Sequence, residues 1–400
     1  MRPADDLPAR GDQGAPEEPR KARWLVLTSA LAPYMLRLWE ALAAPPHGQK
    51  VRVLSSARKE SSSHGNEHIA FDSPWLEVLR IDNEANRYAS LPEILRYDPD
   101  IVVACGHARA SNLALPWAIK RLRPQTKLYY LGDSNVLDLI EDAAASPARS
   151  LALSLKRKAI ASTFRESLSL GWTNRLAHQS LGIAHSLDIP CCALDFDRLD
   201  ASRATTRLPQ TLLDALAKLR RPRFLCPARL VPQKNHHALL EAFRLARASD
   251  PDFRASLCLI GDGPEREPLL VQGASWSAEE FQSLGAVEAS MMGALYAHFD
   301  ALVLPSKVEP WGIVATEALA LGIPVVASEK VGSAQSLATL VGEAVLLTRP
   351  DVEGLASALI QMWKELETRK AVARARAEQV RARFDVVQVA ARLAALAAPP

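Results

Sequence analysis

Short apolar runs alternate with longer segments of helical period along most of the chain. Five runs in the first half are predicted to be strands, at 24–29, 51–55, 76–81, 100–106 and 127–133. Six runs in the second half have the same character, at 223–230, 255–263, 281–287, 301–306, 324–328 and 344–348. Helical periodicity separates many of these runs, as in 237–249 and 289–299. Such alternation is typical of parallel sheets covered by helices, so the pattern predicts an α/β fold with two doubly wound domains.

The two series of strands define the predicted domain boundaries. Residues 1–22 mix acidic, basic and proline residues without an apolar run, so we expect a disordered tail and no signal peptide. Residues 23–197 and 222–375 hold the two domains, and the polar, basic segment 198–221 is expected to link them. Residues 376–400 are predicted to form a C-terminal helix, whose apolar face must dock, and the first domain is a candidate surface.

Composition narrows the class of protein. With 48% hydrophobic and 23% charged residues, the chain of 400 residues has the balance of a globular protein with two cores. No apolar stretch is long enough to span a bilayer. The formal net charge of +3 is too small to indicate nucleic-acid binding. The five cysteines include Cys105, Cys226 and Cys258 inside predicted strands, where thiols are buried, and this usage indicates a reducing cytoplasm.

Two carboxylates follow the predicted strand at 301–306, in the segment Glu309-Pro-Trp-Gly-Ile-Val-Ala-Thr-Glu317. Pro310 and Gly312 suit a tight turn into a helix. The free N–H groups and the dipole at the start of such a helix favour a bound anion. The alternative is an ordinary strand-to-helix connection that carries two solvated acids.

Basic side chains follow the first strand of the second series. Arg229 and Lys234 lie across a proline turn, at the carboxyl end of the strand, where doubly wound folds bind ligands. A guanidinium and an ammonium there would neutralise a leaving diphosphate in place of a metal ion. A glycine-rich turn at 261–263 ends the next strand on the same edge. Taken singly, these features also fit surface cations and a backbone glycine.

Together, the segments at 224–243, 257–266 and 294–328, with the later run at 341–347, resemble family 4 of the retaining glycosyltransferases, which has the GT-B fold of two Rossmann-like domains facing across a cleft. The resemblance implies that Arg229 and Lys234 contact the diphosphate of a nucleotide diphosphate-sugar donor. It implies that Glu309 contacts the donor hexose and Glu317 the ribose.

The resemblance also implies further donor-binding positions. The backbone that follows Glu309 would lie against the sugar and phosphates, through Pro310, Trp311, Gly312, Ile313 and Val314. Gly263 and Val287 would approach the nucleotide. His107, at the end of the strand at 100–106, is a candidate to face the donor sugar, with a packed loop histidine as the alternative.

The expected activity is transfer of a hexose to an acceptor hydroxyl with retention of anomeric configuration. The expected acceptor is a glycan, lipopolysaccharide or glycolipid, and no metal or other cofactor is expected. One alternative is a sugar-nucleotide epimerase of the same fold, which the paired glutamates disfavour. A non-catalytic paralogue that binds the nucleotide-sugar is the other.

Three further segments carry chemistry that competes with this interpretation. His64 and His68 match an inverted zinc-protease motif, but in a Ser- and Gly-rich segment that disfavours a helix. Asp195 and Asp197 imitate a metal-binding acidic triplet and are interpreted as linker acids. Residues 149–175 hold six basic residues and one acid, with apolar residues at helical spacing. This segment is expected to be a solvated helix face, with a peripheral membrane contact as the alternative.

Overall fold

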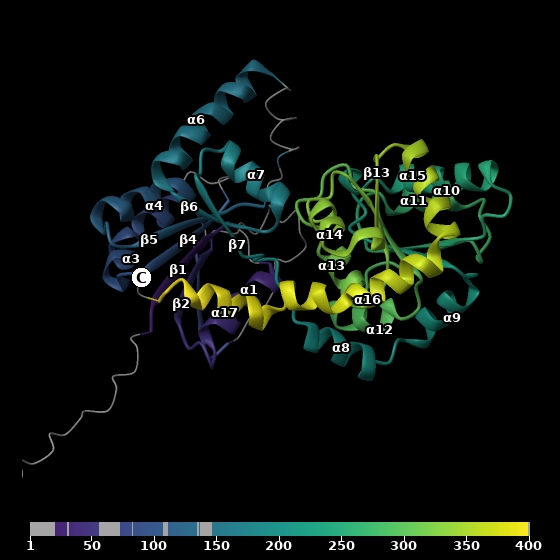
Figure 1. Ribbon diagram of the computed structural model, residues 1–400, viewed down its shortest axis with the longest axis horizontal. Helices are drawn as coiled ribbons and strands as arrows, with labels where there is room; N and C mark the ends of the chain where they lie inside the picture. The colour runs from purple at the N-terminus through teal and green to yellow at the C-terminus, as the bar shows by residue number, and fades with distance from the viewer. Residues whose placement is uncertain are drawn as a thin grey trace, which may run out of the picture.

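The computed structural model describes residues 21–29, 32–55, 73–81, 83–106, 111–133, 136 and 146–398. These residues form two α/β domains that lie side by side, and the C-terminal helices run along both of them (Figure 1). All paired strands are parallel in both sheets. The predicted fold class is therefore confirmed.

The first sheet has seven strands in the order β3-β2-β1-β4-β5-β6-β7. Its strands are β1 (Arg23–Thr28), β2 (Lys50–Ser55), β3 (Leu76–Arg80), β4 (Ile101–Cys105), β5 (Lys127–Leu131), β6 (Glu166–Ser169) and β7 (His185–Asp188). Its helices include α1 (Pro33–Ala43), α2 (Glu84–Ala89), α3 (Leu91–Tyr97), α4 (Ser111–Leu122), α6 (Pro147–Thr163) and α7 (Trp172–Ser180). The five predicted strands are confirmed as β1 to β5.

Strands β6 and β7 were missed by the sequence pattern because they are short and rich in serine. Ser167 and Ser169 are buried in β6, where apolar residues are usual. The Ser167 hydroxyl donates to Ser186 Oγ at 3.0 Å, and the Ser169 hydroxyl donates to Leu187 O at 3.1 Å. These side-chain hydrogen bonds satisfy buried polar groups that a hydrophobic pattern does not anticipate.

The second sheet has six strands in the order β10-β9-β8-β11-β12-β13. They are β8 (Arg223–Pro227), β9 (Ser256–Ile260), β10 (Phe281–Ser283), β11 (Ala301–Leu304), β12 (Val325–Ser328) and β13 (Val345–Thr348), and all six were predicted. Its helices are α8 (Phe196–Thr205), α9 (Gln210–Lys218), α10 (His236–Ser249), α11 (Arg266–Gly273), α12 (Met292–Tyr296), α13 (Ile313–Ala320), α14 (Ala334–Val341) and α15 (Val352–Lys364).

Alternate strand residues enter different cores, as the period of a strand requires. In β1, Trp24 and Val26 pack in a core that extends into the second domain, while Leu25 and Leu27 pack in a core confined to the first. Both faces of β1 are therefore buried. This accounts for the continuous apolar run that the sequence shows there.

The C-terminal segment consists of α16 (Leu366–Phe384) and α17 (Val386–Ala395). Asp385 ends the first helix and caps the second, since its Oδ1 accepts from the backbone N–H groups of Val387 and Gln388. Helix α16 packs on α13, and α17 packs on α1, so the predicted return to the first domain is confirmed (Figure 1).

Two segments of the chain connect the domains, and they lie side by side where they cross. Leu194 N–H donates to Phe384 O, and Val386 N–H donates to Leu194 O, each at 2.8 Å. Residues 198–221, which were expected to be a linker, lie beyond this crossing and contain most of α8 and all of α9. Helix α8 packs on α12 of the second domain.

Candidate functional site

The loops that follow β8 and β9 are locked together at the carboxyl edge of the second sheet. Leu230 N–H donates to Asp262 O, and Glu265 N–H donates to Leu230 O, both at 3.0 Å. A Cβ atom at Gly263 would lie 2.4 Å from Leu230 O, and the φ angle of Gly263 is +157°. Only glycine fits this approach. The predicted donor-binding glycine therefore has a structural role in shaping the edge.

Lys234 ends a short 3₁₀ turn, Pro232–Lys234, whose position is fixed by the next residue. Asn235 adopts a left-handed φ of 62°, and its buried side-chain amide donates to Pro305 O and Pro350 O at 3.0 and 2.7 Å. The ammonium of Lys234 forms an ion pair with Glu309 Oε2, and the two side chains are 19% and 15% exposed. The fold thus brings together two predicted site residues that are 75 positions apart in the chain.

The turn that carries Glu309 is held against the loop after β12. Gly332 N–H donates to Glu309 O, and Ser333 N–H donates to Trp311 O, both at 2.9 Å. A Cβ atom at Gly332 would lie 1.8 Å from Pro310 O. The backbone of residues 309–311 is therefore fixed by main-chain contacts and is rigid before any ligand binds.

Helix α13 begins directly after this turn. Gly312 caps it with a left-handed φ of 83°, as the predicted turn requires. Glu317 lies in the second helical turn, where its Oε2 accepts from the hydroxyl of Tyr296 at 2.7 Å. Burial raises the pKa of Glu317, although the Tyr296 hydrogen bond acts in the opposite direction. The two predicted carboxylates therefore differ, since one is ion-paired and the other is held in a less polar setting.

The remaining predicted donor residues lie on the same domain but differ in exposure. Arg229 is exposed and its side chain forms no hydrogen bond or ion pair with the described residues, so its guanidinium is available to an anion. Val287, Ile313 and Val314 are half-buried. The indole of Trp311 is buried and packs against the ring of Phe384, with centroids 5.8 Å apart. Its side chain therefore supports the domain junction.

The second-domain turn meets the first domain directly. The hydroxyl of Thr173, on α7, donates to Gly332 O at 3.1 Å in a buried hydrogen bond. Burial raises the pKa of Cys192, and the charges of Asp133 and Glu309 add to this rise. Asp133 follows β5 and is exposed. The carboxyl edges of the two sheets therefore converge near Cys192.

Asp133 is a candidate that the sequence reasoning missed. Its signal was the Leu-Gly-Asp sequence at the end of β5, since Asp133 follows its strand at the same distance as Arg229 follows β8 in the second half. His107, the candidate in the first half, lies outside the described residues, as do His64 and His68.

The described residues contain neither a grouped set of metal ligands nor a membrane-spanning helix. Among them, no three His, Cys, Asp or Glu side chains are grouped so that they could hold a metal ion. Asp195 caps α8 by accepting from Arg198 N–H at 2.9 Å, which explains this acid without a metal. None of the described helices has the length and apolarity needed to cross a bilayer.

The basic segment 149–175 is not one helix, because it contains nearly all of α6, strand β6 and the start of α7. Ile160 and Phe164 are buried in the first-domain core. Leu151 and Leu155 are 64% and 60% exposed on the outer part of α6, which projects from the domain (Figure 1). The predicted apolar stripe is therefore divided between the core and the surface.

Comparison with known sequences identifies the family of the second domain. The sequence model of the Glycosyl transferases group 1 family matches residues 213–379. A GDP-mannose-dependent monoacylated alpha-(1-6)-phosphatidylinositol monomannoside mannosyltransferase from Corynebacterium glutamicum is 28% identical over 46% of this chain and 50% of its own length. The O-antigen chain mannosyltransferase B of Escherichia coli is 31% identical over 36% of this chain and 39% of its own length. The chain thus spans half or less of the length of these relatives.

Comparison with solved structures extends the likeness of fold to both domains. Anabaena HepE in complex with UDP is 19% identical, with a TM-score of 0.67 over 94% of this chain and 99% of that one. The sucrose-phosphate synthase of Thermosynechococcus elongatus is 20% identical, with a TM-score of 0.64 over 94% of this chain. The chain thus has the GT-B fold, and its residues 213–379 match the sequence model of the Glycosyl transferases group 1 family.

Proposed function

We propose that this protein is a retaining glycosyltransferase of family 4, which moves a hexose from a nucleotide diphosphate-sugar to an acceptor hydroxyl. The observation that carries the proposal is the ion pair between Lys234 and Glu309 beside the N-terminus of α13, with Arg229 unpaired on the same sheet edge. These groups match, residue by residue, the donor-binding pattern that the sequence resembles.

The geometry supports charge stabilisation without a metal ion. As the bond between sugar and diphosphate breaks, negative charge grows on the diphosphate oxygens. Arg229, Lys234 and the free N–H groups at the start of α13 are positioned to stabilise it. Glu309 holds the Lys234 ammonium in place. We propose that the donor takes over this ammonium through its phosphate, which leaves the Glu309 carboxylate to accept hydrogen bonds from the hexose hydroxyls.

We propose that the configuration is retained because the acceptor hydroxyl attacks the sugar from the same face from which the leaving group departs. A double displacement would need a carboxylate nucleophile on the opposite face of the sugar. Glu309 is the carboxylate that the family pattern assigns to the hexose, and we propose that it accepts hydrogen bonds from the hexose hydroxyls and does not attack the anomeric carbon. A leaving diphosphate oxygen then takes the acceptor proton. Product configuration, measured by NMR, tests retention itself, because an inverted product would overturn it.

The acceptor is proposed to be a glycan or a glycolipid that approaches from the first domain. The names of two relatives refer to an O-antigen chain and to a phosphatidylinositol monomannoside. Asp133 lies exposed at the carboxyl edge of the first sheet, where a carboxylate would orient an acceptor hydroxyl. We place the reaction in the cytoplasm, because all five cysteines are buried, free thiols.

Incubation with a panel of nucleotide-sugars tests the activity. Nucleotide release is followed with and without a saccharide or lipid extract as the source of acceptor. Acceptor-dependent release supports the transferase, acceptor-independent release of the nucleotide points to the epimerase, and binding without release identifies a non-catalytic protein. Activity should survive EDTA, and a complete loss that magnesium or manganese reverses would overturn the metal-free proposal.

A peripheral membrane contact is proposed for the outer part of α6. Leu151 and Leu155 are exposed there, next to the exposed cations Lys156, Arg157 and Lys158. Apolar side chains beside cations suit an anionic lipid surface. Sedimentation with anionic vesicles should weaken with salt and on neutralising these cations. Binding that neither treatment changes would leave a solvated helix.

A further inference from the structure

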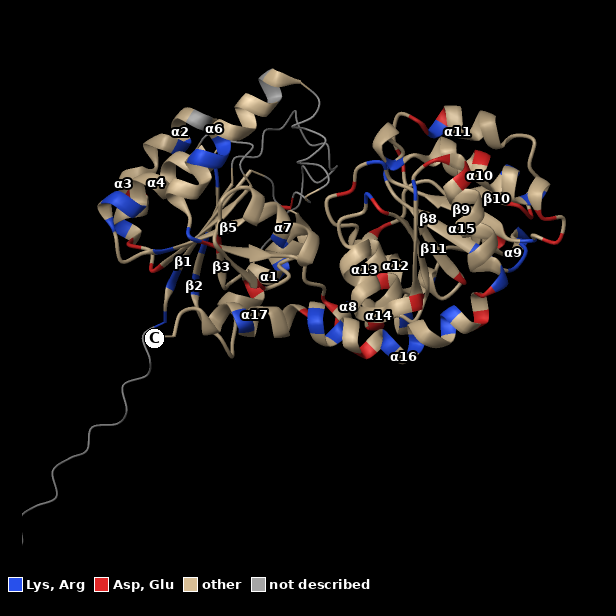
Figure 2. Cartoon of the chain, turned by 45° about the horizontal axis from the view of Figure 1, so that its top comes forward, with Lys and Arg blue, Asp and Glu red and all other residues tan. Residues whose placement is uncertain are grey.

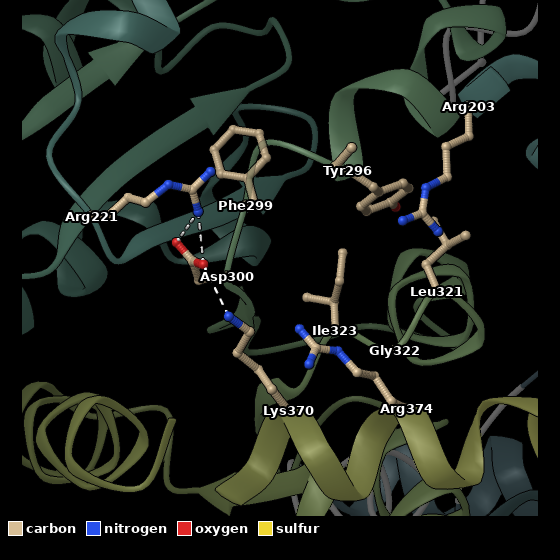
Figure 3. Close-up of a pocket in the computed structure, with 11 residues that line it drawn as sticks. Arg203, Arg221, Tyr296, Phe299, Asp300, Leu321, Gly322, Ile323, Lys370 and Arg374 are labelled. Atoms are coloured by element: carbon tan, nitrogen blue, oxygen red, sulfur yellow. Dashed lines mark hydrogen bonds and ion pairs between the residues drawn. The ribbon is translucent and has the colours of Figure 1, made fainter. Parts of the chain in front are cut away.

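A cavity of about 260 Å³ opens on the second domain, away from the strand edge that carries Lys234 and Glu309. Helices α8, α12 and α16 and the turn after α13 form its walls (Figure 3). The described lining residues are Arg203, Arg221, Tyr296, Ala297, Phe299, Asp300, Leu321, Gly322, Ile323, Lys370 and Arg374. We call it the α16 cavity. Pockets for drug-sized ligands are usually about 300 to 1,000 Å³, so this one suits a smaller molecule.

The charge of the α16 cavity is strongly one-sided. Four cationic side chains line it with a single carboxylate among the described lining residues, an excess that equals the formal net charge of the whole chain, +3. In Figure 2 several Lys and Arg positions are blue along α16, which supplies two of these cations. A concentration of charge on so small a surface selects for anionic ligands.

Asp300, the carboxylate of the cavity, is already neutralised. It lies 2.8 Å from Arg221 Nη1 and 3.3 Å from Lys370 Nζ, and its side chain is only 8% exposed (Figure 3). It also accepts from Arg223 N–H at 2.9 Å. Asp300 therefore orients Arg221 and Lys370. Its charge is balanced by these two cations and does not offset the other two.

Arg203 and Arg374 are the cations in excess. Both side chains point into the cavity, from α8 and α16 (Figure 3). Neither forms a hydrogen bond or an ion pair with the described residues. Asp200, the acid whose pKa Arg203 helps to lower, is held by Arg381 in a two-pronged pair at 2.7 and 2.8 Å.

The carboxyl end of α13 does not account for these arginines. That end carries partial negative charge, which attracts cations. Arg381 already donates to Ala320 O at 3.0 Å there. Arg203 and Arg374 thus remain without an internal counterion.

We propose that the α16 cavity binds a compact phosphorylated metabolite through Arg203 and Arg374. Guanidinium groups match phosphate oxygens in charge and geometry. Tyr296 and Ile323 would contact the apolar or sugar part of the ligand.

The cavity is linked to the proposed donor site through one side chain. The ring of Tyr296 lines the cavity, and its hydroxyl donates to Glu317 Oε2 at 2.7 Å. The turn at 321–323, which also lines the cavity, follows α13, the helix that carries Glu317. A ligand that moves Tyr296 therefore changes the carboxylate assigned to the ribose. This coupling rests on the proposed function, whereas binding of the phosphate does not.

Titration calorimetry with inorganic phosphate tests the site itself. The titration uses Lys234→Ala protein, in which the proposed diphosphate site is weakened. Adding Arg203→Gln and Arg374→Gln should weaken binding about 10-fold or more. The control pair, Arg244→Gln and Arg254→Gln, removes the same charge from exposed positions on the same domain and should leave the affinity unchanged. Equal affinities in the two variants, or no binding in the Lys234→Ala protein, would overturn the proposal.

A second arm distinguishes a soluble phosphate compound from a lipid headgroup. Sedimentation with phosphatidylglycerol vesicles should be the same for the two arginine pairs. Loss of vesicle binding on changing Arg203 and Arg374, without loss of phosphate binding, would assign the cavity to lipid and overturn the soluble ligand.

A separate variant tests the coupling between the α16 cavity and the donor site. Tyr296→Phe keeps the ring and removes the hydroxyl that reaches Glu317. It should bind phosphate as the wild type does but lose the effect of phosphate on UDP or GDP affinity, because coupling between sites is reciprocal and needs a contact that both share. Phosphate also competes directly with the nucleotide at the donor site. This competition persists in every variant and sets the baseline for the effect of phosphate on nucleotide affinity. An undiminished effect in Tyr296→Phe would overturn the link, even if the protein proves to be a transferase.

Discussion

The two domains share one architecture but hold the carboxyl edges of their sheets by different means. In the second domain the loops contact each other through the main chain, as at Gly332, where a Cβ atom would lie 1.8 Å from Pro310 O. In the first domain buried amide side chains make contacts of the kind that Asn235 adds in the second domain. Asn112 donates to Cys105 O at 2.6 Å, and Asn174 donates to Gly132 O at 2.8 Å.

This difference separates two ways of building a binding edge. Main-chain contacts between loops require glycine and fix the backbone closely, which suits the unvarying diphosphate and ribose of a nucleotide-sugar. Side-chain contacts hold a strand end from a distance and leave the intervening loops free to differ in sequence. The same contrast explains why the sequence motifs of the second half are recognisable and those of the first half are not.

The largest expected effect is on catalysis in the second domain. Lys234→Ala should lower kcat by about 30- to 1000-fold, or about 2 to 4 kcal/mol, and weaken donor binding less, because the ammonium meets charge that develops as the sugar leaves. Steady-state kinetics and donor titration provide the measurement. Lys307→Ala, an exposed lysine nearby, is the control.

The free energy of unfolding distinguishes a catalytic role of Lys234 from a role in pairing with Glu309 alone. Removing Lys234 leaves the partly buried Glu309 without its partner. Adding Glu309→Gln should recover any lost stability but not the turnover. Near-normal kcat in Lys234→Ala would remove this residue from the site.

Gly332→Ala should break the main-chain brace of the second domain. The new methyl group overlaps Pro310 O, and no rotamer change relieves the clash, so we expect a loss of about 1 to 3 kcal/mol or more in unfolding free energy and weaker donor binding. Ser333→Ala, at the next buried residue, only removes an atom and is the control. If both variants melt together and bind donor equally, the brace is not rigid.

Asn174→Ala should break a side-chain brace of the first domain. It removes a donor to Gly132 O and an acceptor for Leu170 N–H, both in buried hydrogen bonds, at a cost of about 1 to 3 kcal/mol. Donor affinity, measured on the folded protein, should stay the same because the donor contacts lie on the other domain. Gln179→Ala, exposed on the same helix, should change neither quantity. A loss of donor affinity in Asn174→Ala would show that the two edges act as one unit.

The smallest expected effect is a gain in stability. Burial raises the pKa of Glu317, so ionised Glu317 destabilises the folded protein above its folded pKa, and this cost is absent below the unfolded value of 4.5. Glu317→Gln keeps an acceptor for Tyr296 and should raise the melting temperature at pH 7, with the gain shrinking towards pH 4. Donor binding should fall. Glu267→Gln, at a side chain that is 79% exposed, should show neither change. A pH-independent gain would contradict burial as its cause.

Much of the fold followed from local pattern. Eleven strands were predicted because each is an apolar run bounded by turns, and the order of the motifs indicated the GT-B fold. Serine-rich β6 and β7 were missed because their buried hydroxyls bond to neighbouring strands. The residues from 198 to 221 were assigned to a linker because the polar outer face of α8 concealed the packing of this helix on α12 of the second domain.

The sequence by itself determined which residue types stand at each strand end, since glycine, proline and charged residues mark the turns there. Only the tertiary structure decided their partners. Lys234 meets Glu309 because β8 and β11 are neighbours in the sheet, although the residues are 75 positions apart. Arg203 and Arg374 share a cavity because α16 packs back across the domain. Contacts of this kind depend on how helices and strands pack over long separations, and no local pattern along the chain records that packing.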